Sequence, residues 1–418
     1  MDPADRVKEL ESRFLLRSGE TMTLRQKYSD HVFFGSAALW CMCNGIMHVI
    51  VPLYAISLGY SILEISSIVA VPVLATLVVR FVGGALSDRF GERGVLQGCY
   101  SLMTLAALML IGAEGYASLM IVLVVANVSR STFWIPAQSL ATQLPGANVG
   151  KKLGKLAATN YSGTLLGQVL GGVMAAFLGY GLSFLILSGL ALSCTLLSLA
   201  LSQPGAKPKG RTVWQITLGV GNFLRYSRTW LIISASGAAA LPLAMCISIY
   251  PVYLAHLNFG EQWIGVAVSL RSLGPIATGL LLGAWITPAR QRLFYGLGMV
   301  VLGVSLIASG YLERYLFLSL CIILLGAGGG VMDLLYQVQA SALSQASDRS
   351  MAMATTGMGW NLSPFFMPLI VGWLVEMRGF EIAFLVSGLF LMLIGAGTHF
   401  WFRLCALDEG AFTKLASK

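Results

Sequence analysis

Apolar runs of about twenty residues follow one another along most of the chain, and polar residues gather in short stretches between them. A run of that length spans a bilayer as an α-helix, because a helix satisfies its own backbone hydrogen bonds in lipid. The runs do not alternate apolar with polar residues, as membrane β-strands do. The pattern predicts an all-α membrane protein with twelve transmembrane helices, at residues 32–57, 62–86, 94–112, 117–141, 153–179, 181–202, 229–256, 262–286, 292–310, 315–340, 351–376 and 380–403.

The composition supports a membrane protein without resident cofactor chemistry. Of 418 residues, 56% are hydrophobic and only 11% are charged, whereas a soluble domain carries about 25% charged residues. The seven cysteines are scattered along the spans and are interpreted as small apolar residues. The sequence contains no pattern typical of a metal site or a phosphate-binding loop. We therefore expect no metal, no cofactor and no ATPase domain, so that an ion gradient supplies the energy.

The positions of Lys and Arg predict the orientation in the membrane. Of the 27 Lys and Arg residues, Arg314 and Arg378 fall in loops on one side and Arg80, Arg130 and Arg271 lie within spans. The rest fall in, or at the edge of, segments on the other side, so both termini are predicted to be cytoplasmic. The net charge of +9 then reflects membrane topology and anionic lipid. We expect no nucleic-acid partner and no cleaved signal peptide.

An internal repeat divides the chain into two halves. At a constant offset of 199 residues, Gln138 falls on Gln337 and residues 188–190, Ser-Gly-Leu, fall on residues 387–389. Two like halves predict a site at their interface and rocking between inward-open and outward-open states. The predicted organisation is two pseudo-symmetric six-helix bundles at residues 32–202 and 229–403, a cytoplasmic linker at residues 203–228, and cytoplasmic tails at residues 1–31 and 404–418.

Charges cluster in the turn between the second and third predicted helices. The stretch "GALSDRFGER", residues 84–93, fits the pattern G-x-x-x-D-R-x-G-x-R. At this place in a twelve-helix chain it resembles the major facilitator superfamily, from about residue 30 to about residue 405. The resemblance implies a cytoplasmic gating latch; the alternative is a set of charges that only marks an inside loop. The second half has Thr287 in place of the acid, so its latch is degraded. The latch residues are Gly84, Asp88, Arg89, Gly91 and Arg93.

A second motif lies on the fifth predicted helix. The stretch "GTLLGQVLGG" places Gly163, Gly167, Gly171 and Gly172 as in an antiporter-type pattern, with Gln168 where that pattern has proline. In the family this pattern is associated with export. Small residues at this spacing also let helices pack closely, so a plain packing stripe is the alternative.

Arg130, in "NVSRSTFW", falls near the midplane of the fourth predicted helix. A midplane charge is costly in lipid, so a functional role is the default interpretation and a buried structural pair is the alternative. Exporter-type family members carry an arginine here that is linked to proton coupling. Asp333, His48 and Arg130 are the candidates for proton coupling.

Polar and aromatic side chains concentrate on the helices that the resemblance places around a central cavity. Core packing remains open for the aromatic residues, a hydrogen bond to a neighbouring helix for His48, and snorkelling to the interface for Arg80. The predicted substrate-binding residues are Asn44, His48, Arg130, Trp134, Gln138, Tyr250, Tyr253, Arg271, Asp333, Gln337, Trp360 and Asn361.

The excess of positive charge in the predicted cavity favours an anionic or zwitterionic solute. The sequence therefore predicts a secondary transporter that works by alternating access, with proton-coupled export as the main hypothesis. Uptake of an organic anion and lipid flipping are alternatives within transport. A membrane-embedded enzyme would need a compact catalytic constellation, and a scaffold would not need the polar stripe. We expect a monomeric, multi-pass protein of a bacterial inner membrane, whose partners are the solute and the lipid bilayer.

Overall fold

The computed structural model describes residues 3–143, 149–201, 224, 227–282, 285–286, 290–342 and 355–416, and this part of the chain contains α-helices and no β-strand. The predicted linker at residues 203–228 lies almost wholly outside the described residues. The helices are α1 (Pro3–Ser57), α2 (Ile62–Ala70), α3 (Val73–Leu110), α4 (Tyr116–Gln143), α5 (Val149–Ser198), α7 (Ser227–Ile247), α8 (Ile249–His256), α9 (Glu261–Leu270), α10 (Leu273–Leu282), α11 (Gln291–Tyr311), α12 (Tyr315–Ala342) and α14 (Gly359–Ala416).

Three glycines turn the chain inside long helical elements. Gly91 in α3, Gly179 in α5 and Gly379 in α14 have φ angles of 75°, 70° and 82°, with extended ψ angles. A side chain rarely tolerates this region of φ, whereas glycine adopts it freely. Each glycine lies where a turn between two transmembrane helices is predicted. Each of these three elements therefore consists of two helical segments joined by a tight turn.

The chain is also interrupted inside predicted spans. Residues 71–72 separate α2 from α3, Ser248 separates α7 from α8, and Arg271 and Ser272 separate α9 from α10. Pro72 has no N–H to donate, and Ser248 has φ −131° and ψ −71°, which no α-helix contains. The predicted spans 62–86, 229–256 and 262–286 are therefore each built from two helical pieces.

Eight helical stretches within the described residues are long and apolar enough to cross a membrane. Two of them, residues 154–198 and 359–397, are 45 and 39 residues long. A single crossing takes about 17–25 residues, so each of these two stretches is long enough for two crossings, joined at Gly179 and Gly379. A multi-pass membrane protein follows from these lengths, while the count of twelve spans stays a prediction.

Two helices extend beyond their predicted ends. α1 begins at Pro3, whereas the hydrophobic pattern starts a helix at residue 32, and α14 continues to Ala416 beyond the predicted end at residue 403. Apolar periodicity locates the part of a helix that is buried, and helical backbone continues past it because local propensity allows it.

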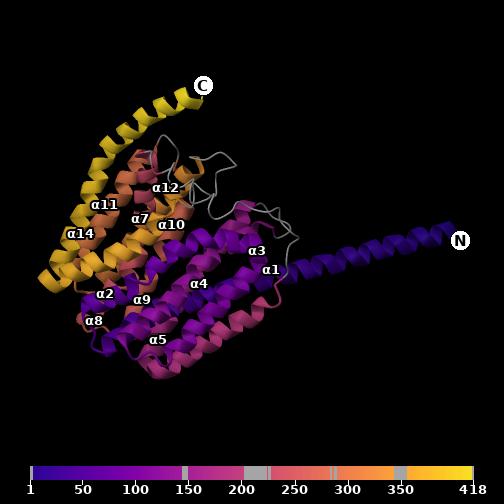
Figure 1. Cartoon of the computed structure of the whole chain (residues 1–418), viewed down its shortest axis with the longest axis horizontal. Helices are drawn as coiled ribbons and strands as arrows, with labels where there is room; N and C mark the ends of the chain where they lie inside the picture. The colour runs from indigo at the N-terminus through magenta and orange to yellow at the C-terminus, as the bar shows by residue number, and fades with distance from the viewer. Residues whose placement is uncertain are drawn as a thin grey trace.

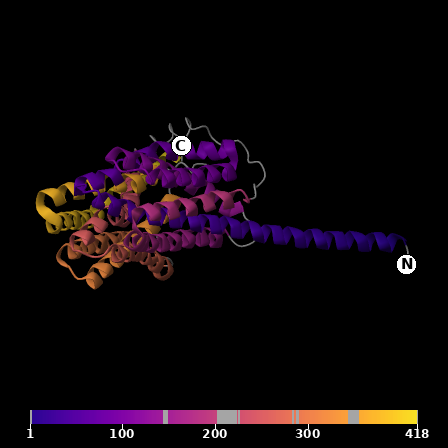
Figure 2. The same ribbon diagram turned by 90° about the horizontal axis from the view of Figure 1, so that it is seen from below.

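Apart from α2 and α9, the helices from α1 to α5 pack mainly on one another, and so do those from α7 to α14. α1 packs on α5 and α3 on α4, while α11 packs on α14 and α12 on α7 and α10. Figures 1 and 2 show the first set in indigo to magenta and the second in orange to yellow. The two sets meet where α5 crosses α9 and where α14 crosses α2.

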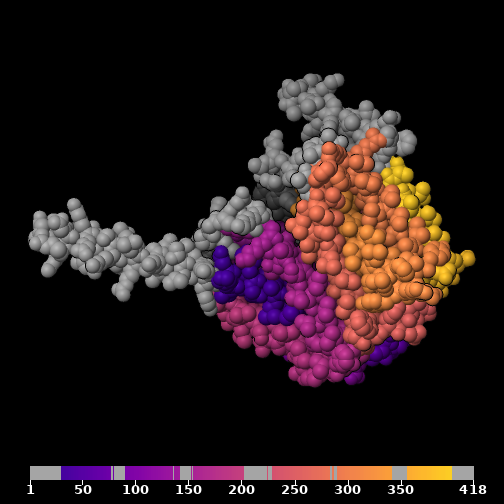
Figure 3. All heavy atoms as spheres, turned by 180° about the vertical axis from the view of Figure 1, so that it is seen from behind, coloured from indigo at the N-terminus to yellow at the C-terminus, as the bar shows by residue number. Residues whose placement is uncertain are grey.

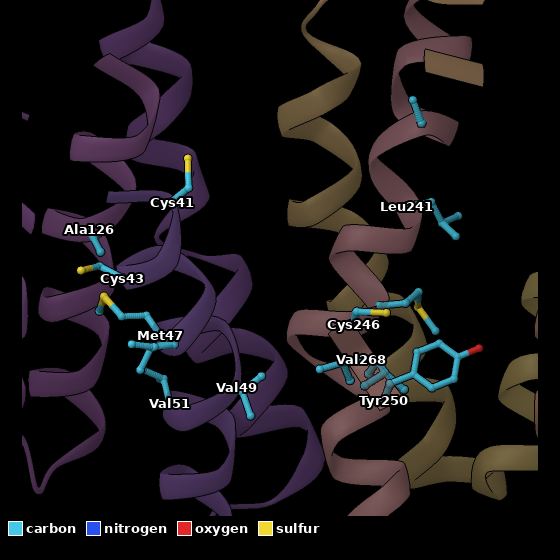
Figure 4. Close-up of a cluster of buried hydrophobic side chains, with 14 of the residues drawn as sticks. Cys41, Cys43, Met47, Val49, Val51, Ala126, Leu241, Cys246, Tyr250 and Val268 are labelled. Atoms are coloured by element: carbon cyan, nitrogen blue, oxygen red, sulfur yellow. The ribbon is translucent and has the colours of Figure 1, made fainter. Parts of the chain in front are cut away.

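Buried apolar side chains fill the space between neighbouring helices in both sets. Figure 4 shows Cys43 and Met47 on α1 beside Ala126 of α4, and Cys246 beside Tyr250 and Val268 in the second set. The described cysteines are free and buried. They pack as small apolar groups, which is the interpretation that the sequence suggested.

Candidate functional site

A small cavity lies among the helices of the first set. Asn44, His48, Asn127 and Arg130 line it from α1 and α4, and Ile247 of α7 reaches it from the second set. The free space is about 40 Å³, which holds a few water molecules but is well below the roughly 300 Å³ of a typical ligand pocket. In this conformation the cavity is closed around its polar residues.

Three basic side chains act on one another electrostatically, and two of them, His48 and Arg130, line this cavity. The charges of Arg130 and Arg271 repel each other, and both act on the ring of His48. His48 of α1 and Arg130 of α4 thus interact electrostatically with Arg271, which lies between α9 and α10. Among the charged groups of the described residues that act strongly on Arg130, none is a carboxylate.

Two of these basic side chains have a buried nitrogen atom without a hydrogen-bond partner in the described part of the chain. Arg271 is 7% exposed, and its Nε has no hydrogen bond; the Nδ1 of His48 has none either. A buried polar atom without a partner costs roughly 1–3 kcal/mol, more for a charged group. The Nε–H of Arg271 can therefore donate a hydrogen bond to an acceptor such as an oxygen of an anionic solute. Nδ1 of His48 can do so when it carries a proton.

Asp333 and its neighbours form a second polar group. The Nε2 of Gln337, one turn away on α12, donates to Oδ2 of Asp333 over 2.9 Å, and the side chain of Trp360 on α14 hydrogen-bonds the same carboxyl. The charges of Asp333 and Arg271 both act on Tyr161 of α5. Asp333, Gln337 and Trp360 are thus brought together as neighbours.

Tyr161 is a site residue that the sequence analysis missed. It lies between the two sets of helices, on α5, where charges of the second set act on it. The spacing of Tyr161, Gln168 and Gly172 places them on one face of α5, which is the signal that could have identified Tyr161. In the structure Gly172 on this face contacts α9. That face could be recognised only once the partner of Gly172 was known.

Asn361 connects the two sets of helices. The hydroxyl of Thr76 on α3 donates to Oδ1 of Asn361 on α14 over 3.1 Å, while Nδ2 of Asn361 has no partner among the described groups. Asn361 is 7% exposed and does not line the small cavity. It holds α3 against α14 in this conformation.

Trp134 and Gln138 lie farther along α4 and do not line the cavity. The ring of Trp134 packs edge-on against Phe133, with centroids 5.3 Å apart. Gln138 is exposed. The polar stripe of α4 therefore contributes Asn127 and Arg130 to the cavity.

Tyr250 and Tyr253 are placed in helix packing, away from the cavity. The hydroxyl of Tyr250 is 2.7 Å from the hydroxyl of Ser309 on α11, and the hydroxyl of Tyr253 donates to the Ser309 carbonyl over 3.0 Å. Both rings pack on Phe384 of α14, and both are buried. In this conformation neither tyrosine lines the cavity, and their contact with substrate stays a prediction.

The charged motif at residues 84–93, around the turn in α3, lies only partly within the described residues. Gly84 and the side chains of Asp88 and Arg89 lie outside the described part of the structure. At Gly91 the chain turns, and the guanidinium of Arg93 donates to the carbonyl of Leu199 over 2.7 Å. The final carbonyls of a helix lack intrahelical partners and attract a cation. Arg93 therefore caps the end of α5 in this conformation.

The glycines of α5 let other helices approach its backbone. A Cβ at Gly163 would lie 2.8 Å from the carbonyl of Ala38, one at Gly167 would clash with the carbonyl of Met42, and one at Gly171 would lie 3.0 Å from that of Ile46. These three positions pack against α1. Gly172 faces α9, where its Cβ would lie 2.5 Å from the carbonyl of Glu261. Gln168 is fully buried between these faces.

The two sets of helices close on each other at the end where α2 and α9 begin. The N–H of Leu63 in α2 donates to Glu376 of α14 over 2.9 Å, and the hydroxyl of Tyr180 in α5 donates to Glu261 of α9. Gly172 and Gly265 bring the same two helices, α5 and α9, into backbone contact. In the predicted orientation this is the outer end of the molecule.

Alanine at Gly172 and Gly265 should hold this end apart. A Cβ at Gly265 would lie 2.6 Å from the carbonyl of Gln168, so both substitutions place a methyl group against backbone. Overpacking of this kind costs about 1–3 kcal/mol, which shifts the equilibrium between closed and open forms roughly 5- to 150-fold. We expect faster thiol labelling of a cysteine introduced at Val69, which lines the cavity, and slower transport.

The matched control is Gly189→Ala, also on α5, where a Cβ would meet nothing within 4 Å. It should leave both labelling and transport unchanged. Wild-type labelling and transport in the Gly172→Ala, Gly265→Ala double variant would contradict a close contact that closes the outer end.

A bundle of apolar helices in two packed sets, with a small charged cavity that residues of both sets line, is the arrangement of a membrane carrier. The sequence profile of the Major Facilitator Superfamily matches residues 32–261 and again residues 232–412. The chain belongs to the Major Facilitator Superfamily. It is a multi-pass membrane transporter and not an enzyme.

Individual relatives are distant. A protein of Lactococcus lactis subsp. lactis (strain IL1403), described as a multi-drug resistance efflux pump PmrA homolog, is 25% identical over 358 residues, which cover 82% of this chain and 87% of that protein. The crystal structure of the nucleoside transporter NupG superposes with a TM-score of 0.74 at 11% identity, covering 90% of this chain and 99% of that one. A POT family transporter in complex with 5-aminolevulinic acid superposes with a TM-score of 0.75 at 13% identity, covering 90% and 96%. These two structures share the fold.

Proposed function

We propose that this transporter moves a small anionic or zwitterionic solute across the membrane by alternating access. The observation that carries the proposal is that the charges of Arg130 and Arg271 act on each other and on His48 across the two sets of helices, with no carboxylate among the charged groups that act strongly on Arg130 in the described part of the chain. Buried cations are stable only when they are paired or hydrated. An anion that enters between Arg130 and Arg271 neutralises the positive charge that each set of helices contributes to the site.

The binding cycle follows from this charge distribution. Without solute, the two guanidinium groups repel each other and favour separation of the halves. A bound carboxylate or similar anion removes the repulsion and allows the halves to close around it. A solute stabilises the closed form only by the difference in its affinity for the two forms. The direct charge contacts of Arg130 and Arg271 supply that difference.

We further propose proton-coupled export from a bacterial inner membrane, by a monomer. The closed contacts at Glu261 and Glu376 lie at the predicted outer end, so this conformation is suited to loading from the cytoplasm. The Lactococcus relative carries the name of an efflux pump, which also favours export. Asp333 is the candidate that takes up and releases the proton. Its charge and that of Arg271 both act on Tyr161, so the two charged groups lie in the same region.

Transport in vesicles tests the proposal. The purified protein is reconstituted, and uptake of matched organic anions, zwitterions and cations is measured under a pH gradient of either sign. The relevant vesicles have an acidic lumen and hold the protein with its predicted cytoplasmic face outward. Anions or zwitterions should accumulate in these vesicles. Transport of cations alone would overturn the proposed substrate class. Accumulation only under the opposite gradient would indicate uptake instead of export, and no effect of either gradient would overturn proton coupling.

A further inference from the structure

A groove runs along the outside of the molecule between α1 and α5. Small residues form most of its walls, and it holds about 510 Å³ of free space. Figure 3 shows indigo surface from the early part of the chain beside magenta surface from α5 on this face. The groove is lined by Gly35, Ala38 and Met42 of α1 and by Ala158, Ser162 and Leu166 of α5.

The groove faces away from the polar cavity. On α1, Ala38 and Met42 lie on average about 120° around the helix from Asn44 and His48, by the 100° turn per residue. On α5 the groove side continues along the helix as a row of exposed apolar side chains. Apolar side chains on the outside of a transmembrane helix face lipid. The exposed row consists of Leu166, Leu170, Val173 and Phe177.

One end of the groove carries a positive charge. Lys155 lines it at the start of α5 and is exposed, and its Nζ lies 4.0 Å from the centroid of the Phe34 ring. In the predicted orientation this end is cytoplasmic. From Lys155 to Leu166, α5 rises by about 16 Å at 1.5 Å per residue. That is close to half of the roughly 30 Å hydrocarbon core, which is the depth of one leaflet.

We propose that this groove binds one anionic phospholipid of the cytoplasmic leaflet. An acyl chain lies along the small residues of α1 and α5, and the phosphate of the headgroup pairs with the ammonium of Lys155. The match is one of length, because the groove spans a leaflet, and of charge, because Lys155 stands at headgroup depth. The glycines of α5 that bring α1 close also shape the floor of the groove at Gly163.

The lipid site is separate from the polar cavity, because none of the residues that line the groove lines the cavity. Native mass spectrometry of the full-length protein in detergent measures binding of added phosphatidylglycerol and phosphatidylcholine. The wild-type protein should bind phosphatidylglycerol more tightly. Lys155→Gln should reduce that preference about fivefold, since a basic residue near the surface contributes about 1 kcal/mol to binding of anionic lipid.

A second variant tests the apolar part of the groove. Ala158→Phe fills it with a ring while keeping Lys155, so binding of both lipids should fall. Arg292→Gln, an exposed basic residue on α11 at the same predicted face, is the charge control and should bind both lipids as the wild type does. Unfolding temperature confirms that each variant is folded. Wild-type phosphatidylglycerol binding in Lys155→Gln would overturn the headgroup contact, and wild-type binding of both lipids in Ala158→Phe would overturn the groove.

Discussion

Arg130→Ala is expected to abolish transport of an anionic solute, while the protein still inserts in the membrane. Arg130 lines the cavity, and its charge acts on His48 and Arg271. Truncating one partner of a buried charge pair costs about 2–5 kcal/mol, which is a factor of roughly 30 to several thousand in affinity. Equilibrium binding of the transported anion to detergent-solubilised protein and its initial transport rate in vesicles measure the loss.

Arg130→Lys distinguishes charge from geometry. Lysine keeps the positive charge but lacks the planar fork that binds a carboxylate through two hydrogen bonds. We expect this variant to retain measurable but reduced transport. Arg314→Ala, an exposed arginine in the loop before α12, is the control and should transport normally. Normal transport by Arg130→Ala would show that Arg130 supports the structure and does not contact the solute.

Asp333→Asn should abolish accumulation against a gradient and leave exchange of solute across the membrane measurable. Asparagine has nearly the same shape and can still accept hydrogen bonds from Gln337 and Trp360, but it cannot carry the proton. A carrier that no longer binds the driving proton still changes sides with its solute. The measurement is accumulation in proteoliposomes with a pH gradient, compared with counterflow of labelled solute without one.

Glu313→Gln provides the matched control for Asp333→Asn, because Glu313 is an exposed carboxylate in the loop before α12. It should accumulate solute as the wild type does. If Asp333→Asn still concentrates solute, Asp333 is not the proton carrier. His48 is then the next residue to replace, since it lines the cavity and has an unpartnered, buried Nδ1.

The helical fold could be predicted from local features of the sequence. Hydropathy identifies a membrane span because each residue's transfer into lipid depends on that residue alone. The turns at Gly91 and Gly379 lie in the gaps between predicted spans, and the turn at Gly179 lies at the end of one, because the apolar runs stop at these places. The breaks at Ser248 and Arg271 were not predicted, because each lies inside a run that is long and apolar enough overall to be taken as one span.

The candidate site was predictable only as a set of residues. Polar side chains in lipid are costly, so Asn44, His48 and Arg130 stood out in the sequence. Which of them line one cavity depends on the rotation of each helix about its axis. That rotation places Tyr250 and Tyr253 against Ser309 and leaves Trp134 outside the cavity. The same dependence hid Tyr161, whose neighbours belong to the other half of the chain.

The sequence by itself determined that this chain is a helical membrane protein, where its glycine turns fall and which charges lie within its spans. Those properties depend on single residues and their near neighbours. Only the tertiary structure decided that Arg130 and His48 meet Arg271, that the glycines of α5 pack on α1 while Gly172 packs on α9, and that Lys155 stands at the end of an outer groove. Each of these depends on contacts between helices far apart in the sequence, which the order of residues along one helix does not specify.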